Sequence, residues 1–458
     1  MSKTVLAIDI GSTKVCAIIA QIDDDKKITV IGAGIAKSQG LKRGTITNIE
    51  LASRSIEQAV TDAKRVSGSA VETAVVSMSG SYAKSLDSSG IVNLTSKEVS
   101  IKDIERVMQT SLYNAKIPNE YEVLHALPYN FKVDEQDFID DPLGMNASRL
   151  EVETHIITTQ KSSLSNLKKA VKGAGIEVEN IILNGYASAI AVLDESEKEL
   201  GVAVIDMGGT SCNIVIHVGN SIRYNDFLGV GSNHVTNDLS MALHTPLNVA
   251  NNIKLTYGSL NDESTDLIEI PKIGDENAKH EVSLAVVHDV ILARVEETLM
   301  ILAKIIENSG LKDQIGAGVV LTGGFAKMEG IKEYASVFFD SKPVRIAKPK
   351  ELDGLFENLR SPEYACAVGL IMHTAGGYTP YEVDVNKRVR HSNENIVEKK
   401  SANLKEEIAL EKNQNDKHPF SLDEEKKETN IVNITEKSKQ NDMNKPLSKF
   451  WNWATQLF

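Results

Sequence analysis

This chain contains the same local pattern twice: an apolar strand, an Asp, a short turn of Gly and Ser or Thr, and a second apolar strand. The first copy begins TVLAIDIGSTK at Thr4, and the second, GVAVIDMGGTSCNIVIHV, runs from Gly201 to Val218. Val and Ile runs on both sides of a Gly-bearing turn predict two strands joined by a tight hairpin. Two such hairpins in one chain predict an internally duplicated α/β fold.

The turns carry residue types that suit a phosphate site. Glycine lets the backbone approach a ligand closely, and the N–H groups of such a turn can point at a phosphate. Asp9 and Asp206 end the first strand of each copy and are placed to hold a hydrated Mg²⁺ between the phosphates. A Rossmann or P-loop glycine run would open a helix, but a second strand follows here both times. The pattern therefore favours the actin-like (ribonuclease H-like, duplicated) α/β fold, in which two hairpins clamp phosphates from opposite domains.

The composition argues against several classes of partner. The net charge of −13 and the pI near 5.4 disfavour nucleic acid, whose backbone requires clustered Lys and Arg. The same charge disfavours an anionic membrane, so any membrane contact needs a dedicated segment. No apolar run approaches the ~20 residues that span a bilayer, and the opening MSKTVLAIDIG shows no signal-peptide pattern. Cys16, Cys212 and Cys366 are far apart and lack metal-ligand spacing, which predicts buried, reduced thiols.

A block between the two copies carries a more specific signal. It contains Ile117-Pro118, the run LHALPYNFKVDEQ, DPLGM from Asp141 and SRLE from Ser148. These runs, at these spacings, resemble the FtsA family of bacterial cell-division proteins. In that family this insertion replaces one of the subdomains of actin and is a protein-contact surface. The residues themselves show only Gly and Pro turns between strands, so the interaction role comes from the resemblance.

The resemblance extends to the nucleotide site, with ATP and Mg²⁺ as the expected cofactors. Gly318–Phe325 is similar to the family's adenosine motif, where glycines leave room for a purine against the backbone. Asp9 and Asp206 would organise the metal. The expected nucleotide-binding residues are Gly11, Ser12, Thr13, Lys14, Gly208, Gly209, Thr210, Ser211, Gly231, Asn233, Asn251, Lys254, Gly323, Gly324 and Phe325.

The chain departs from the family pattern near this site. Asn184 stands in a segment where relatives carry an acidic residue and a proline, and Asn251 stands where they carry the ribose-facing Glu. Thr210 replaces a third glycine, and Asn213 replaces an acidic residue. Asn251 can still hydrogen-bond a ribose, so its contact with the sugar is expected to be weakened and not lost. Loss of the acidic residues near Asn184 and at Asn213 removes candidates for orienting an attacking water. We therefore assign no catalytic residue and expect at most a slow ATPase activity. ATP would act mainly as a switch for binding and polymerisation.

Helical and strand periodicity divides the chain into interleaved subdomains. Helices are expected over 49–67, 101–115, 163–173, 186–193 and 282–310, and a polar, mobile loop region over 259–280. In the subdomain names of the family, the expected boundaries are 1–81, 161–198 and 346–381 for 1A, 82–160 for the inserted α+β subdomain 1C, 199–225 and 311–345 for 2A, and 226–310 for 2B.

The C-terminal residues change character twice. Residues 382–445 are rich in Lys, Glu, Asn, Asp and Ser, which predicts a disordered linker with an end-to-end distance on the order of 45 Å. Residues 446–458, PLSKFWNWATQLF, carry both tryptophans and predict an amphipathic helix lying in the membrane interface. Its expected membrane-facing residues are Leu447, Phe450, Trp451, Trp453, Leu457 and Phe458.

Together these features predict a cell-division protein that binds ATP, polymerises with itself as an actin-like filament and anchors the FtsZ ring to the cytoplasmic face of the cell membrane. It would recruit later division proteins through the inserted subdomain. Arg294 is a candidate FtsZ contact, although it could equally be a solvated helix charge paired with Glu297. The alternatives are a pilus-assembly actin-like adaptor, an actin-fold sugar kinase, for which no general-base motif is found, and a soluble ATPase with an unrelated C-terminus.

Overall fold

Two five-stranded sheets with the same strand order form the framework of the structure, a computed structural model that describes residues 2–261 and 264–391. In each sheet the first strand pairs antiparallel with the second and parallel with the fourth, and the third and fifth strands lie at the edges. This identity of topology confirms the predicted duplication. The first sheet consists of β1 (Lys3–Ile10), β2 (Lys14–Ile22), β3 (Ile28–Lys37), β6 (Thr73–Met78) and β11 (Glu177–Leu183), and the second of β12 (Val202–Met207), β13 (Cys212–Val218), β14 (Ser221–Leu228), β17 (Val319–Thr322) and β18 (Val344–Ile346).

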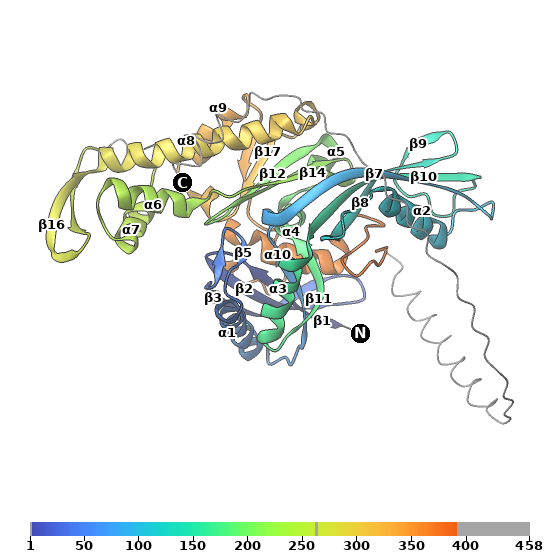
Figure 1. The fold of residues 1–458 in the computed structure, drawn as a ribbon, viewed down its shortest axis with the longest axis horizontal. Helices are drawn as coiled ribbons and strands as arrows, with labels where there is room; N and C mark the ends of the chain where they lie inside the picture. The colour runs from blue at the N-terminus through green and yellow to red at the C-terminus, as the bar shows by residue number, and fades with distance from the viewer. Residues whose placement is uncertain (1, 262–263, 392–458) are drawn as a thin grey trace, which may run out of the picture. The chain divides into compact units, whose positions relative to one another are not determined.

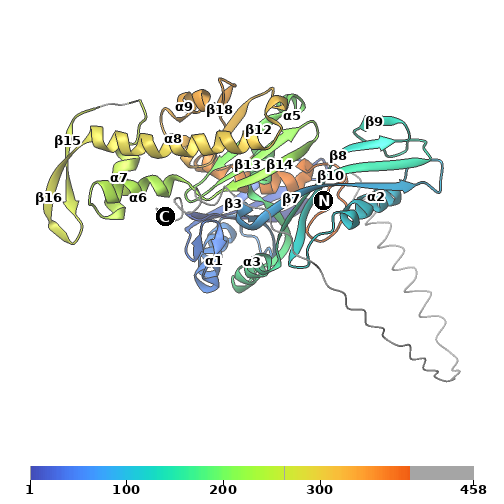
Figure 2. The same ribbon diagram turned by 45° about the horizontal axis from the view of Figure 1, so that its top comes forward.

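Helices α1 (Ile49–Ser67) and α3 (Lys161–Gly173) cover one face of the first sheet (Figure 2). Asn48 caps α1 by accepting a hydrogen bond from the Leu51 N–H, and Gly68 ends it in the left-handed region with φ +65°. The helix packs tightly because β3 presents Gly34, where an added Cβ would lie 2.0 Å from the Ala59 carbonyl oxygen. The short strands β4 (Leu41–Lys42) and β5 (Thr45–Ile46) form a small hairpin before α1.

Two apolar helices, α4 (Asn184–Val192) and α10 (Ala365–Met372), lie between the two sheets (Figure 1). Both are buried almost all round, as their continuous runs of apolar and small residues require. They cross in close contact, since an added Cβ on Gly369 would lie 1.8 Å from the carbonyl oxygen of Ala187. These helices connect the two domains, and we call them the hinge helices.

The second domain packs helices against the opposite face of its sheet. Neighbouring residues of β12 alternate between cores: Val204 faces the hinge helices and Ile205 faces the second core. That core contains side chains from α6 (Ser232–Ala242), α7 (Leu247–Tyr257), α8 (Leu284–Asn308) and α9 (Ile331–Phe338), and the short α5 (Glu195–Leu200) precedes β12.

The prediction of a loop over residues 259–280 is wrong for most of that range. β15 (Leu267–Lys272) and β16 (Asp275–Ser283) form an antiparallel hairpin there, with Gly274 at φ +85° in the turn. The alternating run Leu267-Ile268-Glu269-Ile270 is the strand signal that its polar surroundings obscured. Within the described ranges, no helix is both long enough and apolar enough to cross a membrane.

An inserted subdomain follows β6. Its antiparallel sheet has the order β7-β10-β8-β9, and one helix, α2, packs on that sheet. Ser100 and Asp103 form a capping box that begins α2. The elements are β7 (Ala83–Asn93), α2 (Ile101–Asn114), β8 (Tyr121–Val133), β9 (Gln136–Ile139) and β10 (Arg149–Gln160).

The predicted start of the linker at residue 382 is wrong. Glu382 and Asp384 have no exposed surface, and Val383 exchanges two backbone hydrogen bonds with Ala126 of β8, at 2.9 and 3.0 Å. The segment packs because Tyr381, Val383 and Val385 supply apolar side chains among the charged ones. The remaining linker residues and the predicted helix at 446–458, with its membrane-facing residues, lie outside the described residues.

Candidate functional site

The two Gly-bearing turns have the same geometry and face each other. The Gly11 N–H donates to the Lys14 carbonyl at 3.1 Å, and the Gly208 N–H donates to the Ser211 carbonyl at 2.8 Å. An added Cβ on Gly209 would lie 2.2 Å from the Thr13 Cγ2, so the two turns are in contact. Between them lies a cavity of about 230 Å³. Of the predicted residues, Asp9, Gly11, Ser12, Thr13, Lys14, Asp206, Gly208, Gly209, Thr210, Ser211, Gly323 and Gly324 line it.

Asp9, which is buried, and Asp206, which is half-buried, present two carboxylates to this cavity. The Ser77 hydroxyl donates to Asp9 at 3.0 Å, and the Ser188 hydroxyl donates to Asp206 at 2.7 Å. Burial raises the pKa of both groups, to about 6 for Asp206, where the nearby Asp9 charge also contributes. Two carboxylates that are costly to ionise together fit a divalent cation, whose charge would offset their repulsion.

Lys14 brings a positive charge to the same wall. Its Nζ lies 3.9 Å from the ring centroid of Tyr364 and 3.9 Å from Glu363 Oε1. Burial lowers the pKa of this lysine, an effect that the carboxylates of Glu363 and Asp9 oppose. Glu363 also pairs with Lys327 at 3.3 Å. Sequence reasoning missed Glu363, because it reaches the cavity from a separate part of the chain.

The third Gly turn completes the cavity beside Asp206. Gly323 has φ +87°, and an added Cβ would lie 2.5 Å from Asp206 Oδ1, so a side chain is excluded there. Phe325, two residues after Gly323, does not line the cavity. Its side chain is buried in the second core.

Four other predicted residues lie behind the second turn and are not among those that line the cavity. Gly231 and Asn233 are at the start of α6, where the Asn233 N–H donates to the Gly209 carbonyl at 2.7 Å. Lys254 of α7 is buried and donates to the Thr236 hydroxyl at 2.8 Å. Asn251 is half-buried on the same helix. The contacts of Asn233 and Lys254 brace the second turn and hold α7 to α6.

Three buried polar atoms of cavity-lining residues, Ser79 Oγ, Asn184 Oδ1 and Thr210 Oγ1, have no hydrogen-bond partner among the described residues. Thr210 was predicted to bind the nucleotide, whereas Ser79 and Asn184 were not. Leaving such atoms unpaired costs free energy, so a polar ligand that satisfies them would gain binding. The remaining lining residues that were not predicted are Gly44, Asn213, Ser232, Pro362, Glu363 and Cys366, together with Ile10.

All three cysteines are free and buried, as predicted. Cys366, at the start of α10, is hydrogen-bonded to Asp9 through its thiol, and burial raises the thiol pKa well above its usual range. This cysteine is therefore a structural neighbour of the carboxylate and remains a neutral thiol. Its position could not be inferred from its sequence neighbours.

Arg294, the candidate partner contact, is engaged within the chain. Its guanidinium binds both carboxylate oxygens of Asp238 on α6, at 2.5 and 3.1 Å, and also pairs with Glu297. The sequence was compatible with a pairing between Arg294 and Glu297, and the structure contains that pairing. The contact between Arg294 and Asp238 was not predicted. An acidic peptide would have to compete with Asp238 for this arginine.

The chain has two domains of the same topology, two facing turns with an Asp before each, and an insert with a four-stranded sheet. These features define an actin-like protein with an inserted subdomain. A solved structure titled "PilM-PilN type IV pilus biogenesis complex" matches with a TM-score of 0.59 at 16% identity, covering 81% of this chain and 98% of that one. At this identity the match shows the fold alone.

Sequence comparison gives the family. A family model described as "Cell division protein FtsA" matches residues 203–369, and one described as "SHS2 domain inserted in FTSA" matches residues 80–158. The cell division protein FtsA of Helicobacter pylori is 39% identical over 429 residues, covering 86% of this chain and 87% of the relative. That of Pseudomonas aeruginosa is 37% identical over 374 residues, covering 81% and 89%. The chain belongs to the FtsA family of cell-division proteins.

Proposed function

We propose that this chain binds Mg-ATP in the cavity between its two turns. Its main support is the pair of matching turns in contact beside the cavity, each preceded by an Asp that lines the cavity. Backbone N–H groups and Lys14 would contact the phosphates, and Asp9 and Asp206 would hold hydrated Mg²⁺. A bound Mg²⁺ would supply the positive charge that neutralises the phosphates and both carboxylates.

We expect ATP to act mainly as a switch. Of the three carboxylates in the cavity wall, Asp9 and Asp206 would hold the metal, and Glu363 pairs with Lys14 and Lys327. Asn213 accepts a hydrogen bond from the Gly80 N–H at 3.3 Å, and an amide side chain cannot serve as a general base.

Turnover should therefore stay below ~1 per second, near the bottom of the ordinary enzyme range. A phosphate-release assay at saturating Mg-ATP measures it directly, with Asp206→Asn as the background control. Turnover well above that value in the unmodified chain, and lost in the control, would contradict the switch proposal.

We further propose that the ATP-bound chain polymerises as an actin-like filament and joins FtsZ to the cytoplasmic face of the membrane. Membership of the FtsA family supports the division role, and the terminal sequence supports the membrane contact. One short segment with Lys445 and Lys449 as its nearby cations should bind weakly, while a polymer arrays many copies and gains avidity.

For the FtsZ contact we propose the α6–α8 region, and Arg294 tests it. Arg294→Gln should reduce FtsZ co-pelleting severalfold if the arginine binds an acidic peptide. Asp238→Asn is the matched control, because it removes the bidentate pair but leaves the guanidinium in place. If Arg294 only holds α8 to α6, both variants should act alike, and equal co-pelleting in the two would remove Arg294 from the contact.

A further inference from the structure

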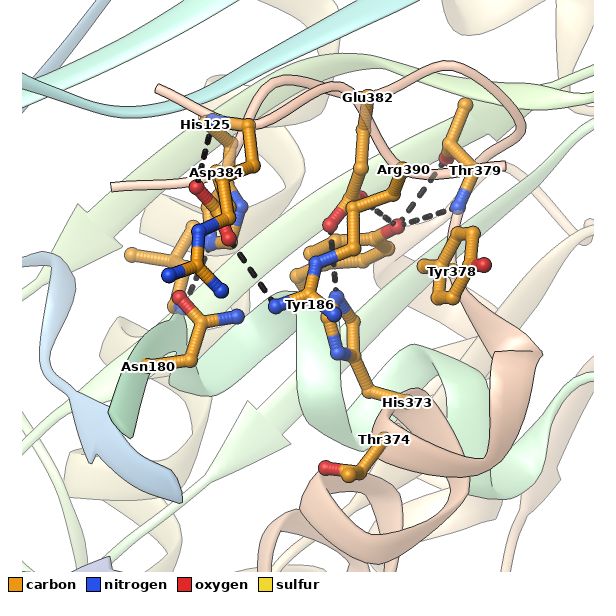
Figure 3. Close-up of polar contacts among 12 residues, drawn as sticks. His125, Asn180, Tyr186, His373, Thr374, Tyr378, Thr379, Glu382, Asp384 and Arg390 are labelled. Carbon is orange, nitrogen blue, oxygen red and sulfur yellow. Dashed lines mark hydrogen bonds and ion pairs between the residues drawn. The ribbon is translucent and has the colours of Figure 1, made fainter. Parts of the chain in front are cut away.

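The segment after the hinge helix α10, residues 378–391, runs against the hinge helices and the insert (Figure 3). We call it the strap. The backbone of Val383 is hydrogen-bonded to β8 of the insert. The Arg390 N–H donates to the Glu382 carbonyl at 2.8 Å, so the two halves of the strap are hydrogen-bonded to each other. Asp384 is fully buried and pairs with the Arg390 guanidinium at 3.0 Å. The chain continues from this strap toward its C-terminal residues.

Glu382 is the centre of the strap's contact with the hinge helices. The Tyr186 hydroxyl of α4 donates to its carboxylate at 2.6 Å, and His373 Nε2 lies 2.8 Å from the other oxygen (Figure 3). Burial alone would raise the pKa of Glu382, but the contacts with His373 and Tyr186 hold it below its usual value. The neighbouring His125 is neutral, because burial lowers its pKa to about 4. A fully buried carboxylate is tolerated only with such partners, so the strap depends on them.

The same two helices also reach the metal carboxylates. On α4, Ser188 donates to Asp206 at 2.7 Å, and it projects about 200° away from Tyr186, on the opposite side of the helix. On α10, Cys366 is hydrogen-bonded to Asp9, and His373 follows the helix about 10 Å further along the axis. Helix α4 therefore contacts a cavity carboxylate through Ser188 and Glu382 through Tyr186. Helix α10 reaches the cavity through Cys366, and His373, which directly follows α10, reaches Glu382. The two helices meet tightly at Ala187 and Gly369.

We propose that the strap and the nucleotide cavity are coupled through the hinge helices, so that nucleotide binding tightens the strap. The proposal rests on the proposed function, since it names a regulation of the same site. A ligand that fixes Asp9 and Asp206 would fix Cys366 and Ser188, and hence the surfaces that hold Glu382. Coupling of this kind is reciprocal, so loosening the strap should also loosen the cavity.

Hydrogen exchange on the full chain tests the coupling at the strap amides of Glu382, Val383 and Arg390. Saturating Mg-AMPPNP should slow their exchange about tenfold in the unmodified protein. Tyr186→Phe removes the hydroxyl that joins α4 to Glu382, so exchange should rise about tenfold or more and the nucleotide response should disappear. The matched control is Tyr381→Phe, which deletes a strap hydroxyl bonded to Asp141 of the insert at 2.5 Å. This control should retain the response.

A second arm needs no nucleotide. Without ligand, exchange at the turn amides of Gly11 and Gly208 should be several-fold faster in Tyr186→Phe than in Tyr381→Phe. If calorimetry shows that nucleotide binds and the strap does not respond, the coupling is overturned while the proposed function stands. If no nucleotide binds, the proposed function fails and the second arm alone decides: equal turn exchange in both variants overturns the coupling. Glu382→Gln replaces Tyr186→Phe if that variant does not fold.

Discussion

Replacing Asp206 with Asn should weaken Mg-ATP binding on the order of 100-fold, as loss of a group that positions a metal commonly does. The same change should stabilise the nucleotide-free protein. Burial raises the pKa of Asp206 from 3.8 to about 6, so the folded state binds the proton more tightly than the unfolded chain. Stability from this group is gained as pH falls from about 6 to 4, and above pH 6 the ionised carboxylate destabilises the fold. At neutral pH, Asp206→Asn removes that charge and should raise Tm by a few degrees.

Calorimetric titration and a thermal unfolding scan measure the two effects in one preparation. The matched control is Asp226→Asn in the same domain, where the carboxylate accepts a hydrogen bond from the Tyr224 hydroxyl and does not line the cavity. It should leave nucleotide affinity unchanged. If Asp206 merely shapes its turn, a folded Asp206→Asn protein would bind Mg-ATP as tightly as the unmodified chain, and the metal role would be wrong.

Trp451→Glu should release the protein from lipid vesicles, even as polymer. At 100° per residue, Trp451 would fall on the same apolar face as Leu447, Phe450, Ala454 and Leu457, at one edge of it. A carboxylate on that face would have to enter the acyl boundary, where an unpaired charge is costly. Vesicle flotation with Mg-ATP measures the bound fraction, which we expect to fall at least tenfold.

The control for this variant carries the same charge on the other face. Asn452→Glu changes the net charge equally and should remain largely bound, because Asn452 falls on the polar side of the helix. Equal release of both variants would indicate repulsion by anionic lipid, and retention of Trp451→Glu would reject an interfacial helix.

The duplicated actin-like fold and the two Gly-bearing turns could be predicted because their signals are local. Asp9 and Asp206 each follow an apolar strand and precede a Gly turn, and short-range geometry places both at the same point of equivalent hairpins. The sequence could not predict that Thr13 and Gly209 would touch, since that contact joins residues of separate domains.

Other parts of the site depend on long-range packing. Glu363 and Cys366 enter the cavity from α10 and the residues before it, and Ser79 enters from the end of β6. Residues 382–391 of the strap were predicted as linker because charged residues dominate the composition there. The alternating run from Tyr381 to Val385 did carry a strand-like signal. The burial of Glu382, however, depends on Tyr186, which is distant in the sequence, and on His373, which lies across a turn.

We propose that the nucleotide-bound chain holds FtsZ on the membrane through its C-terminal segment. The most direct measurement is co-sedimentation of FtsZ with vesicles of phosphatidylethanolamine and phosphatidylglycerol in Mg-ATP, comparing the full chain with one ending at Lys445. We predict that FtsZ pellets with vesicles only when the full chain and ATP are both present. Equal recovery of FtsZ with the shortened chain, or vesicle binding by the full chain that leaves FtsZ in solution, would contradict the account.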